Sequence, residues 1–394
     1  MEVNVLAEKT RKKKRKGSLL KPFLIILVVL MLLLLAANAF AGTTISGIGN
    51  ALTGYAEKLS SGNGYPYDIS SENLKNVYPS DSNIILLTDV YARTLSSGAK
   101  MKLNVQHNYS APVVDANGSR FIIYDRDSKH YRVVNGKTIS DQMEAEGNIL
   151  TCDMAGNGSF AIASRSEQTA STFTVYDRKF NEVFKWNSSS DHIIDVALTD
   201  NGKYVAVAAL GAEKGEVYSK VLIFNVKSSE ALGEFKFSGT AVADLHFTSR
   251  GYLYITGDNM FTIIDKNKSE IKSQETFEAG ALKFISVGEN GETAVMFSKY
   301  GSDNTGTVKY YSYKGEESYS FDSQSSIYGV AADKNKFAVY YGDEIIVYNS
   351  EGQEKDRKNS TADYDKLFYA GSELYLCRTG RIDTFSSLED SSDS

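Results

Sequence analysis

A run of 19 uncharged and mainly apolar residues stands near the start of the chain, FLIILVVLMLLLLAANAFA at positions 23–41. As a helix it would span about 28 Å, close to the thickness of a bilayer's hydrocarbon core. The basic cluster RKKKRK at 11–16 and Lys21 precede it, and such clusters remain cytoplasmic. We therefore predict a basic cytoplasmic tail at 1–21, one transmembrane helix at 22–41, and a cell-membrane protein whose C-terminal part is extracytoplasmic.

A cleaved signal peptide is the alternative interpretation. Ala39, Phe40 and Ala41 fit the small-x-small pattern that signal peptidase recognises, which would make Gly42 the new N-terminus. Apolar regions of signal peptides usually run about 7–15 residues, and the run here is longer. The length favours an uncleaved anchor, and cleavage after Ala41 stays open.

Apolar residues recur at three- and four-residue spacing after the anchor, which is typical of one helix face. They are Ile45, Ile48, Leu52, Tyr55 and Leu59. Gly62-Asn63-Gly64 then breaks this pattern. We interpret 42–64 as a stalk, 65–387 as the folded domain, and the acidic end at 388–394 as a disordered tail.

Short turns between two apolar, β-rich segments recur throughout the folded domain. They lie at Ser80-Asp81-Ser82-Asn83, Asn117-Gly118, Asn157-Gly158, Asp200-Asn201-Gly202, Arg250-Gly251, Asn290-Gly291, Lys334-Asn335 and Gly371-Ser372. Asn and Gly reach the positive φ values of tight hairpin turns. Successive turns are 36 to 49 residues apart, a period typical of β-propeller blades.

The fourth repeat shows the expected blade most clearly. Its strands read HIIDVALT (192–199), KYVAVAAL (203–210), SKVLIFNV (219–226) and ALGEFKF (231–237). The last repeat has only three strands, whereas PYDIS (66–70) stands alone before the first. If that orphan strand completes the last blade, the ring closes and its sheet edges are protected. We predict an all-β propeller of eight blades, with seven as the alternative.

Composition and charge agree with a folded extracytoplasmic domain. Apolar residues make up 42% of the chain, with 25 Tyr and 19 Phe to fill a large core. Residues 1–21 carry a net charge of +6 and the remainder −12, which disfavours nucleic-acid binding. Cys152 and Cys377 fall in distant repeats, so we expect two buried free thiols.

No catalytic or metal-binding spacing is present in the sequence. The four histidines, His107, His130, His192 and His246, are scattered and have no Cys or His partner at ligand spacing. We interpret them as structural or solvent-facing residues, and Trp186 as packing in or between blades. The sequence predicts no metal, no cofactor and no enzyme activity.

Three links between the second and third strands of a repeat are long. They run from Arg165 to Thr172, from Leu210 to Ser219 and from Tyr300 to Thr307. In a propeller these links share one face, and recognition is commonly carried by loops on a rigid scaffold. The candidate binding residues are Arg165, Glu213, Tyr218, Tyr300 and Asp303, and tolerated insertion without function is the alternative.

The chain resembles an uncharacterised bacterial family of single-pass surface proteins with a WD40-like or quinoprotein-like propeller, typical of Gram-positive anaerobes. GNGYPYDIS (62–70), HNYSAP (107–112), the segment 175–210 and the hydrophobic run carry this resemblance. It implies the topology and the fold, and no catalytic residue. Quinoprotein dehydrogenases use repeated tryptophan motifs, and the single Trp of this chain argues against their cofactor.

The favoured function is a non-enzymatic, membrane-tethered module that binds a protein or an envelope polymer. One alternative is an enzyme acting on glycans or small molecules at the channel mouth, which requires carboxylates or metal ligands to converge there. Another is a structural subunit of an envelope complex. The sequence does not determine the oligomeric state.

Overall fold

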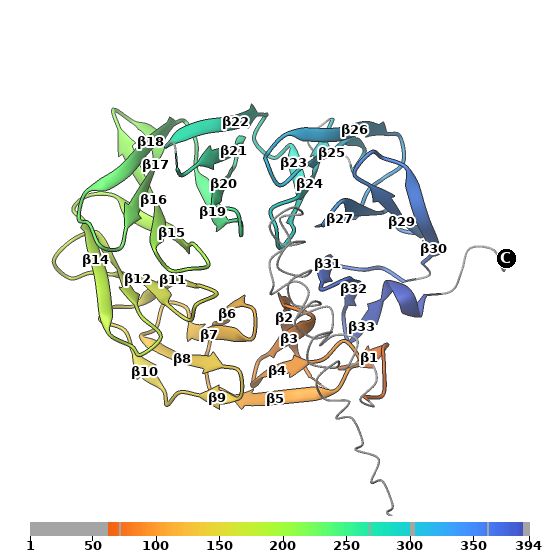
Figure 1. Ribbon diagram of the computed structural model, residues 1–394, viewed down its shortest axis with the longest axis horizontal. Helices are drawn as coiled ribbons and strands as arrows, with labels where there is room; N and C mark the ends of the chain where they lie inside the picture. Colours follow the sequence, from red (N-terminus) through yellow and green to blue (C-terminus); the bar gives the residue numbers. More distant parts are fainter. Residues whose placement is uncertain (1–61, 71, 268, 300–303, 361, 389–394) are drawn as a thin grey trace, which may run out of the picture. The chain divides into compact units, whose positions relative to one another are not determined.

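A computed structural model describes residues 62–388 except 71, 268, 300–303 and 361. The predicted tail, transmembrane helix and most of the stalk lie outside these residues. Within the described part, no helix has both the length and the apolar character needed to cross a membrane. The described residues form eight antiparallel sheets arranged as blades around a common centre (Figure 1). The prediction of eight blades is confirmed.

Each of blades 1 to 4 runs from an innermost to an outermost strand in chain order. Blade 1 contains β2 (Leu74–Ser80), β3 (Asn83–Thr88), β4 (Tyr91–Leu95) and β5 (Met101–Gln106). Blade 2 contains β6 (Pro112–Asn117), β7 (Arg120–Asp125), β8 (His130–Asn135) and the short β9 (Thr138–Ile139) and β10 (Met143–Glu144). Blade 3 contains β11 (Ile149–Met154), β12 (Phe160–Arg165), β13 (Ser171–Tyr176) and β14 (Glu182–Ser188). Blade 4 contains β15 (His192–Leu198), β16 (Tyr204–Glu213), β17 (Glu216–Asn225) and β18 (Ala231–Ser238).

Blades 5 to 7 follow the same order, and blade 8 takes its outermost strand from the start of the domain. Blade 5 contains β19 (Val242–Phe247), β20 (Tyr252–Gly257), β21 (Met260–Asp265) and β22 (Glu270–Thr276). Blade 6 contains β23 (Leu282–Val287), β24 (Thr293–Ser298), β25 (Gly306–Tyr311) and β26 (Glu317–Ser323). Blade 7 contains β27 (Gly329–Asp333), β28 (Lys336–Tyr340), β29 (Glu344–Asn349) and β30 (Glu354–Asn359). Blade 8 contains β31 (Lys366–Ala370), β32 (Glu373–Arg378), β33 (Arg381–Thr384) and β1 (Tyr67–Asp68), and a 3-10 turn, Phe385–Ser387, follows β33.

The orphan strand closes the ring as the sequence predicted. Tyr67 of β1 pairs with Ile382 of β33, and Asp68 pairs with Arg381. The next residue, Ile69, is buried in the core between blades 8 and 1. The two ends of the domain are therefore joined within one sheet, and that sheet has no missing strand.

All eight predicted turns connect the first and second strands of a blade. The structure corrects the interpretation of residues 210–219, which form no loop. Strands β16 and β17 continue as a regular ladder to the pair Glu213 and Glu216, and turn at Lys214 and Gly215. Positive φ at both turn residues suits a two-residue hairpin turn. The sequence did not predict this extension, because its residues are mainly polar or small and so resemble a loop.

Packing between neighbouring blades follows the two-residue period of the strands. In β12, Phe160 and Ile162 pack toward blade 2, whereas Ala161 and Ala163 pack toward blade 4. The two faces of β12 thus pack against different blades, the large side chains against blade 2 and the small ones against blade 4. Full burial of each large side chain stabilises the fold by about 1.5–3 kcal/mol.

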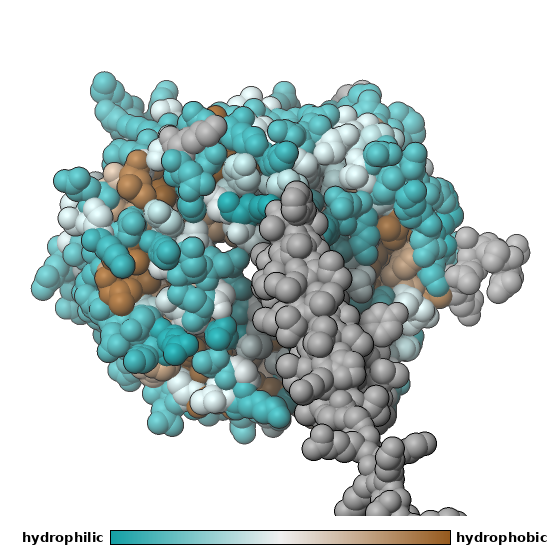
Figure 2. Space-filling view, in the orientation of Figure 1, coloured by the Kyte–Doolittle hydropathy of each residue, from teal (hydrophilic) through white to brown (hydrophobic). Residues whose placement is uncertain are grey.

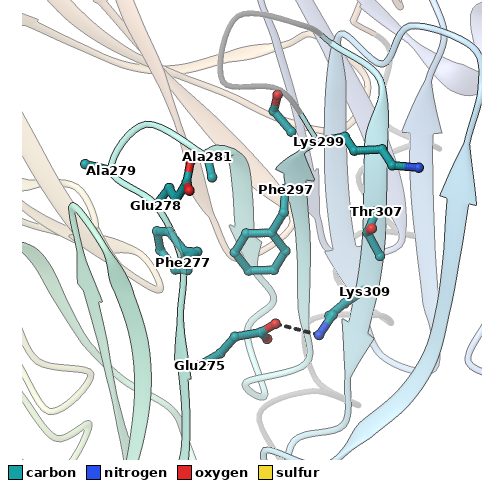
Figure 3. Close-up of a pocket in the computed structure, with 10 residues that line it drawn as sticks. Glu275, Phe277, Glu278, Ala279, Ala281, Phe297, Lys299, Thr307 and Lys309 are labelled. Carbon is teal, nitrogen blue, oxygen red and sulfur yellow. Dashed lines mark hydrogen bonds and ion pairs between the residues drawn. The ribbon is translucent and has the colours of Figure 1, made fainter.

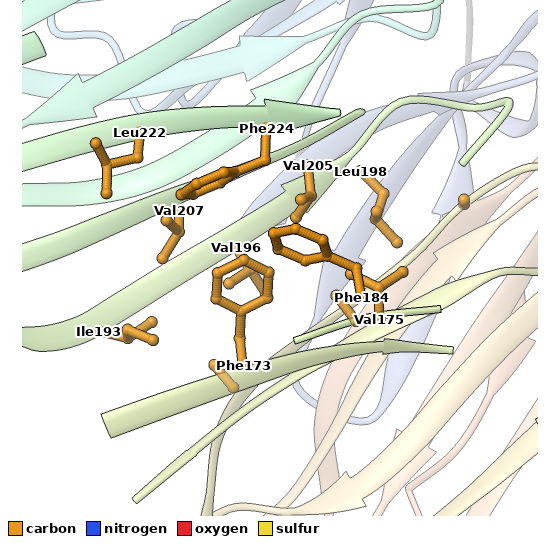
Figure 4. Close-up of a cluster of buried hydrophobic side chains, with 13 residues drawn as sticks. Phe173, Val175, Phe184, Ile193, Val196, Leu198, Val205, Val207, Leu222 and Phe224 are labelled. Carbon is orange, nitrogen blue, oxygen red and sulfur yellow. The ribbon is translucent and has the colours of Figure 1, made fainter. Parts of the chain in front are cut away.

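Aromatic rings fill the core between blades 3 and 4 (Figure 4). The ring centres of Phe184 and Phe224 are 5.3 Å apart, and those of Trp186 and Phe224 are 5.8 Å apart. Trp186 comes from β14 in blade 3 and Phe224 from β17 in blade 4. The expectation that Trp186 packs between blades is confirmed.

The two cysteines are buried and free, as expected. Cys152 lies on β11 in blade 3, and Cys377 lies on β32 in blade 8. Burial raises the pKa of both thiols, to about 12 for Cys377. Because the thiolate is the reactive form, burial keeps both groups unreactive at neutral pH.

The innermost strands of blades 5 and 6 approach each other less closely than those of the other neighbouring blades. Innermost strands of adjacent blades lie side by side around the ring, and β19 and β23 approach each other least. The core between these two blades includes the bulky rings of Tyr254, Phe261 and Tyr311.

Ring closure gives a direct test of the contribution of β1. We expect a chain that starts at Glu72 to unfold at a lower temperature than one that starts at Gly62, because only the shorter chain lacks β1, Tyr65 and Ile69. The loss should be about 3 kcal/mol or more, as for other deletions of buried side chains. Thermal unfolding followed by circular dichroism measures it, and equal midpoints would contradict the role of β1 in closure.

Candidate functional site

The links between second and third strands lie on the same side of the ring as the connections from one blade to the next, because adjacent strands alternate in direction. We call this side the long-loop face. It carries the link 166–170, the tip of the β16–β17 hairpin and the described ends of the link between β24 and β25. Two candidate residues, Tyr300 and Asp303, lie outside the described residues.

Arg165 stands apart from the other candidate residues. Its guanidinium forms an exposed ion pair with Asp127, with Nη2 and Oδ1 3.0 Å apart. Asp127 follows β7, so the pair joins the equivalent links of blades 2 and 3. Exposed ion pairs of this kind contribute little stability, typically below about 1 kcal/mol.

Glu213 and Tyr218 both lie on the β16–β17 hairpin. Their contacts are made by residues that the sequence analysis did not select as candidates. The Tyr218 hydroxyl donates to Asp191 Oδ1 at 2.9 Å. Lys236 Nζ donates to Glu213 Oε2 at 2.7 Å and lies 4.1 Å from the centre of the Tyr218 ring. Burial alone would raise the pKa of Asp191, but hydrogen bonds from Tyr218 and Ser190 and the nearby Lys220 lower it below its usual value.

A shallow cavity of about 340 Å³ lies beside this hairpin. Its lining is formed by Glu213, Lys214, Glu216, Val217, Tyr218, Lys236 and Ser238. Val217 is a large apolar residue with 47% of its surface exposed. The site therefore offers one apolar contact within a set of paired charges, which suits recognition better than catalysis.

The face of the molecule shown in Figure 2 is mainly hydrophilic, and its hydrophobic residues form small, separate groups. Large apolar patches mark extensive protein or membrane contacts. The visible surface of this face lacks such a patch over the described residues.

A second group of polar residues, at the ring centre, was missed by the sequence interpretation. Asp115, Asp153 and Asp195 lie on the innermost strands of three consecutive blades, and each accepts a main-chain N–H of the next blade. The donors are Met154 to Asp115 at 2.6 Å, Leu198 to Asp153 at 2.6 Å and Leu245 to Asp195 at 2.8 Å. In blade 6, Ser286 Oγ accepts the N–H of Ala332 in the same way, at 3.0 Å.

Asp244 and His246 extend this group into blade 5. Both lie on the innermost strand β19 and are exposed, so their side chains face the space at the ring centre. Partial loss of hydration raises the pKa of Asp244, although the charge of the nearby His246 opposes this shift. Burial and the charge of Asp244 raise the pKa of Asp195 to about 7.

The raised pKa values have shared causes, because carboxyl groups that lie close together and are partly shielded from water favour the protonated form. Burial raises the pKa of Asp115 and Asp153 too, and their mutual proximity adds to the shift of Asp153. The convergence of carboxylates that a channel enzyme requires is thus met in part. Three of the four carboxyls, however, are used to hold the next blade. Within the described residues, no three His, Cys, Asp or Glu side chains are placed to hold a metal ion.

These features define the class of the protein, an all-β, eight-bladed β-propeller. The chain belongs to the family of unknown function DUF5711, whose profile matches residues 57–386. No protein of curated function shows significant sequence similarity to it. The resemblance to an uncharacterised propeller family is confirmed, whereas the bacterial group and the membrane anchor stay predictions.

Several solved propellers are similar to the chain. The C-terminal WD40 domain of Sif2 has a TM-score of 0.54 and 13% identity, covering 82% of this chain and 98% of that one. The computationally designed Ika8 protein has a TM-score of 0.53 and 14% identity, with coverages of 79% and 96%. Apo AztD from Citrobacter koseri has a TM-score of 0.51 and 12% identity, with coverages of 73% and 86%. At these identities the likeness concerns the fold alone.

The ring-centre carboxyls predict an unusual pH dependence of stability. The pKa of Asp195 is about 7 in the folded protein and has an ordinary value of 3.8. The folded state therefore binds more protons than the unfolded state between these values, and stability falls as pH rises through this range. Asp195→Asn keeps an amide oxygen to accept the Leu245 N–H but cannot become charged. We expect it to stabilise the protein at pH 8 by on the order of 2 kcal/mol and to have little effect at pH 4.

Asp177→Asn is the matched control for this measurement. Asp177 lies in an exposed turn, where hydrogen bonds from the Asn181 side chain and main chain lower its pKa, so its replacement should give no gain at pH 8. Thermal unfolding of the three proteins between pH 4 and 8 provides the data. An Asp195→Asn variant that is no more stable than the parent at pH 8 would contradict the crowding of these carboxyls.

Proposed function

We propose that the protein is a binding module, held at the cell membrane by residues 22–41, that recognises a protein or an envelope polymer through its long-loop face outside the cytoplasm. The β16–β17 hairpin is the observation that carries this proposal. Its ladder extends beyond the pairing of its neighbours and ends in a pair of glutamates. The hydrophobic run and its basic flank support the tethering.

The contacts of the hairpin favour binding over an accidental insertion. Tyr218 is fixed by Asp191, which belongs to the connection between blades 3 and 4. Lys236 fixes Glu213 from the neighbouring strand β18. A surface whose side chains are already held in place loses less entropy when a partner binds. Val217 is left exposed among these fixed groups as an apolar contact.

A variant at Val217 tests the hairpin as the binding site. We expect Val217→Asp to retain the parent's unfolding temperature, since the side chain is exposed, and to lose at least tenfold in recovery of the partner. The measurement is co-purification of the tagged full-length chain from detergent-solubilised cells, with quantitative mass spectrometry.

Val183→Asp is the control, because Val183 is also exposed and lies on the outer strand β14, close to the turn on the other side of the ring. This variant should recover the same proteins as the parent. Equal recovery by Val217→Asp and the parent would show that the hairpin is not the binding site.

The anchor has a separate test. We expect the mature protein to retain residues N-terminal to Gly42 and to stay in the membrane fraction after an alkaline carbonate wash, because an uncleaved apolar run of this length inserts as a helix. N-terminal sequencing of the protein isolated from its native cells gives the answer. A mature N-terminus at Gly42 would replace the anchor with a cleaved signal peptide.

Enzyme activity at the ring centre is a second candidate function, favoured by the convergence of Asp115, Asp153, Asp195 and Asp244. A carboxyl group with a pKa near neutrality is suited to general acid or base catalysis, and Asp244 and His246 face the central space. Asp244 is the group to test, because Asp115, Asp153 and Asp195 each bind the next blade. Hydrolysis of oligosaccharides that disappears in Asp244→Asn, with unfolding unchanged, would favour this function.

A further inference from the structure

A cavity of about 390 Å³ lies at the interface between blades 5 and 6 (Figure 3). Blade 5 and its exit contribute Glu275, Phe277, Glu278 and Ala279, and blade 6 contributes Ala281, Phe297, Ser298, Lys299, Thr307 and Lys309. It opens on the long-loop face, where β22 ends and β25 begins. Its volume falls within the range of small-ligand pockets.

Two phenylalanine rings form the apolar part of the pocket. The ring centres of Phe277 and Phe297 are 5.0 Å apart. Phe297 is buried, whereas Phe277 is only half-buried and lines the cavity. Phe237 holds the equivalent strand-end position in blade 4, and it is buried in the core between blades 4 and 5. Phe277 therefore presents to the pocket an aromatic surface that its counterpart Phe237 does not.

Preformed polar groups lie beside these rings. Glu275 Oε1 and Lys309 Nζ are 2.5 Å apart, and the Tyr311 hydroxyl donates to the other oxygen of Glu275. Lys309 also lies 5.9 Å from the centre of the Phe297 ring. One edge of the pocket thus presents a carboxylate acceptor and an ammonium donor at fixed positions, as Figure 3 shows for Glu275 and Lys309.

The charges of the residues that line the pocket balance, and Glu317 Oε2 lies 3.4 Å from Lys309 Nζ outside this lining. Glu275 and Glu278 provide two carboxylates, and Lys299 and Lys309 provide two ammonium groups. A phosphate or another strong anion would meet the carboxylates, and a strong cation would meet the lysines. A neutral ligand with many hydroxyl groups uses both kinds of partner, because each hydroxyl donates and accepts.

We propose that this pocket binds a neutral sugar unit of a glycan, with one face of the sugar ring against Phe277 and its hydroxyl groups on Glu275 and Lys309. A pyranose has an apolar C–H face and a polar edge, and the pocket has a matching aromatic surface and polar edge. Charge-assisted hydrogen bonds to Glu275 and Lys309 would orient the sugar. This inference deepens the proposed function by naming the polymer class, and it rests on that function only for the choice of face.

The test uses the full-length chain purified in a detergent without a sugar head group. Isothermal titration calorimetry with cellotetraose, maltotetraose and N-acetylated chitotetraose measures binding. We expect at least one of these neutral oligosaccharides to bind, and Phe277→Ala to lower its affinity at least tenfold. Phe277→Leu should lower the affinity similarly while it retains the apolar contact with Phe297 and the unfolding temperature. This second variant separates the lost aromatic surface from a folding defect.

Tyr328→Ala is the matched control, since Tyr328 is an exposed aromatic residue in the connection between blades 6 and 7 and outside the pocket. Its affinity should equal that of the parent. The proposal is overturned if none of the three oligosaccharides binds, if Phe277→Leu binds as tightly as the parent, or if Tyr328→Ala weakens binding as much as the Phe277 variants. None of these results depends on the β16–β17 hairpin, so failure here is distinguishable from loss of the Val217-dependent partner.

Discussion

The pairing of β1 with β33 is the constraint on which the rest of the structure depends. Seven blades are built from consecutive strands, but blade 8 is complete only when the N-terminal strand joins it. In a closed ring each blade packs against two neighbours, so both faces of its sheet are buried. Large and small side chains alternate over much of strands such as β12 and β16, and the two faces of each strand pack against different blades.

The sequence predicts the ring well because its signals are local and repeated. Asn-Gly and related turns need positive φ, and each stands between two strands whose apolar residues are buried. The β16–β17 extension was missed because Gly211, Ala212 and Lys214-Gly215 resemble a loop in isolation. Cross-strand pairing from Leu210 with Ser219 to Glu213 with Glu216 overrides that local preference.

The candidate sites were less predictable, because they depend on distances between blades. Asp191 is far from Tyr218 in sequence, and Lys236 is far from Glu213, so each pair meets only through the arrangement of strands in the folded blade. The ring-centre group had a sequence signal, since Asp115, Asp153, Asp195 and Asp244 all fall in the first strand of consecutive repeats. The pocket at Phe277 had none, because the same type of residue at the equivalent position 237 is buried in the core, and the sequence does not distinguish the two cases.

Closure by a strand at the start of the domain also has a mechanical consequence. A pulling force applied through the preceding segment would reach the ring first at Gly64 and Tyr65, which donate hydrogen bonds to the carbonyl oxygens of Gly98 and Ser96 in blade 1. It would then reach β1, which holds only two residue pairs, Tyr67 with Ile382 and Asp68 with Arg381. The next contact to resist the force would be the side chain of Ile69, which is buried in the core between blades 8 and 1. Tension would therefore break these few contacts and detach the closing strand before the four-stranded sheets of the other blades open, and the ring would fail first where blades 8 and 1 meet.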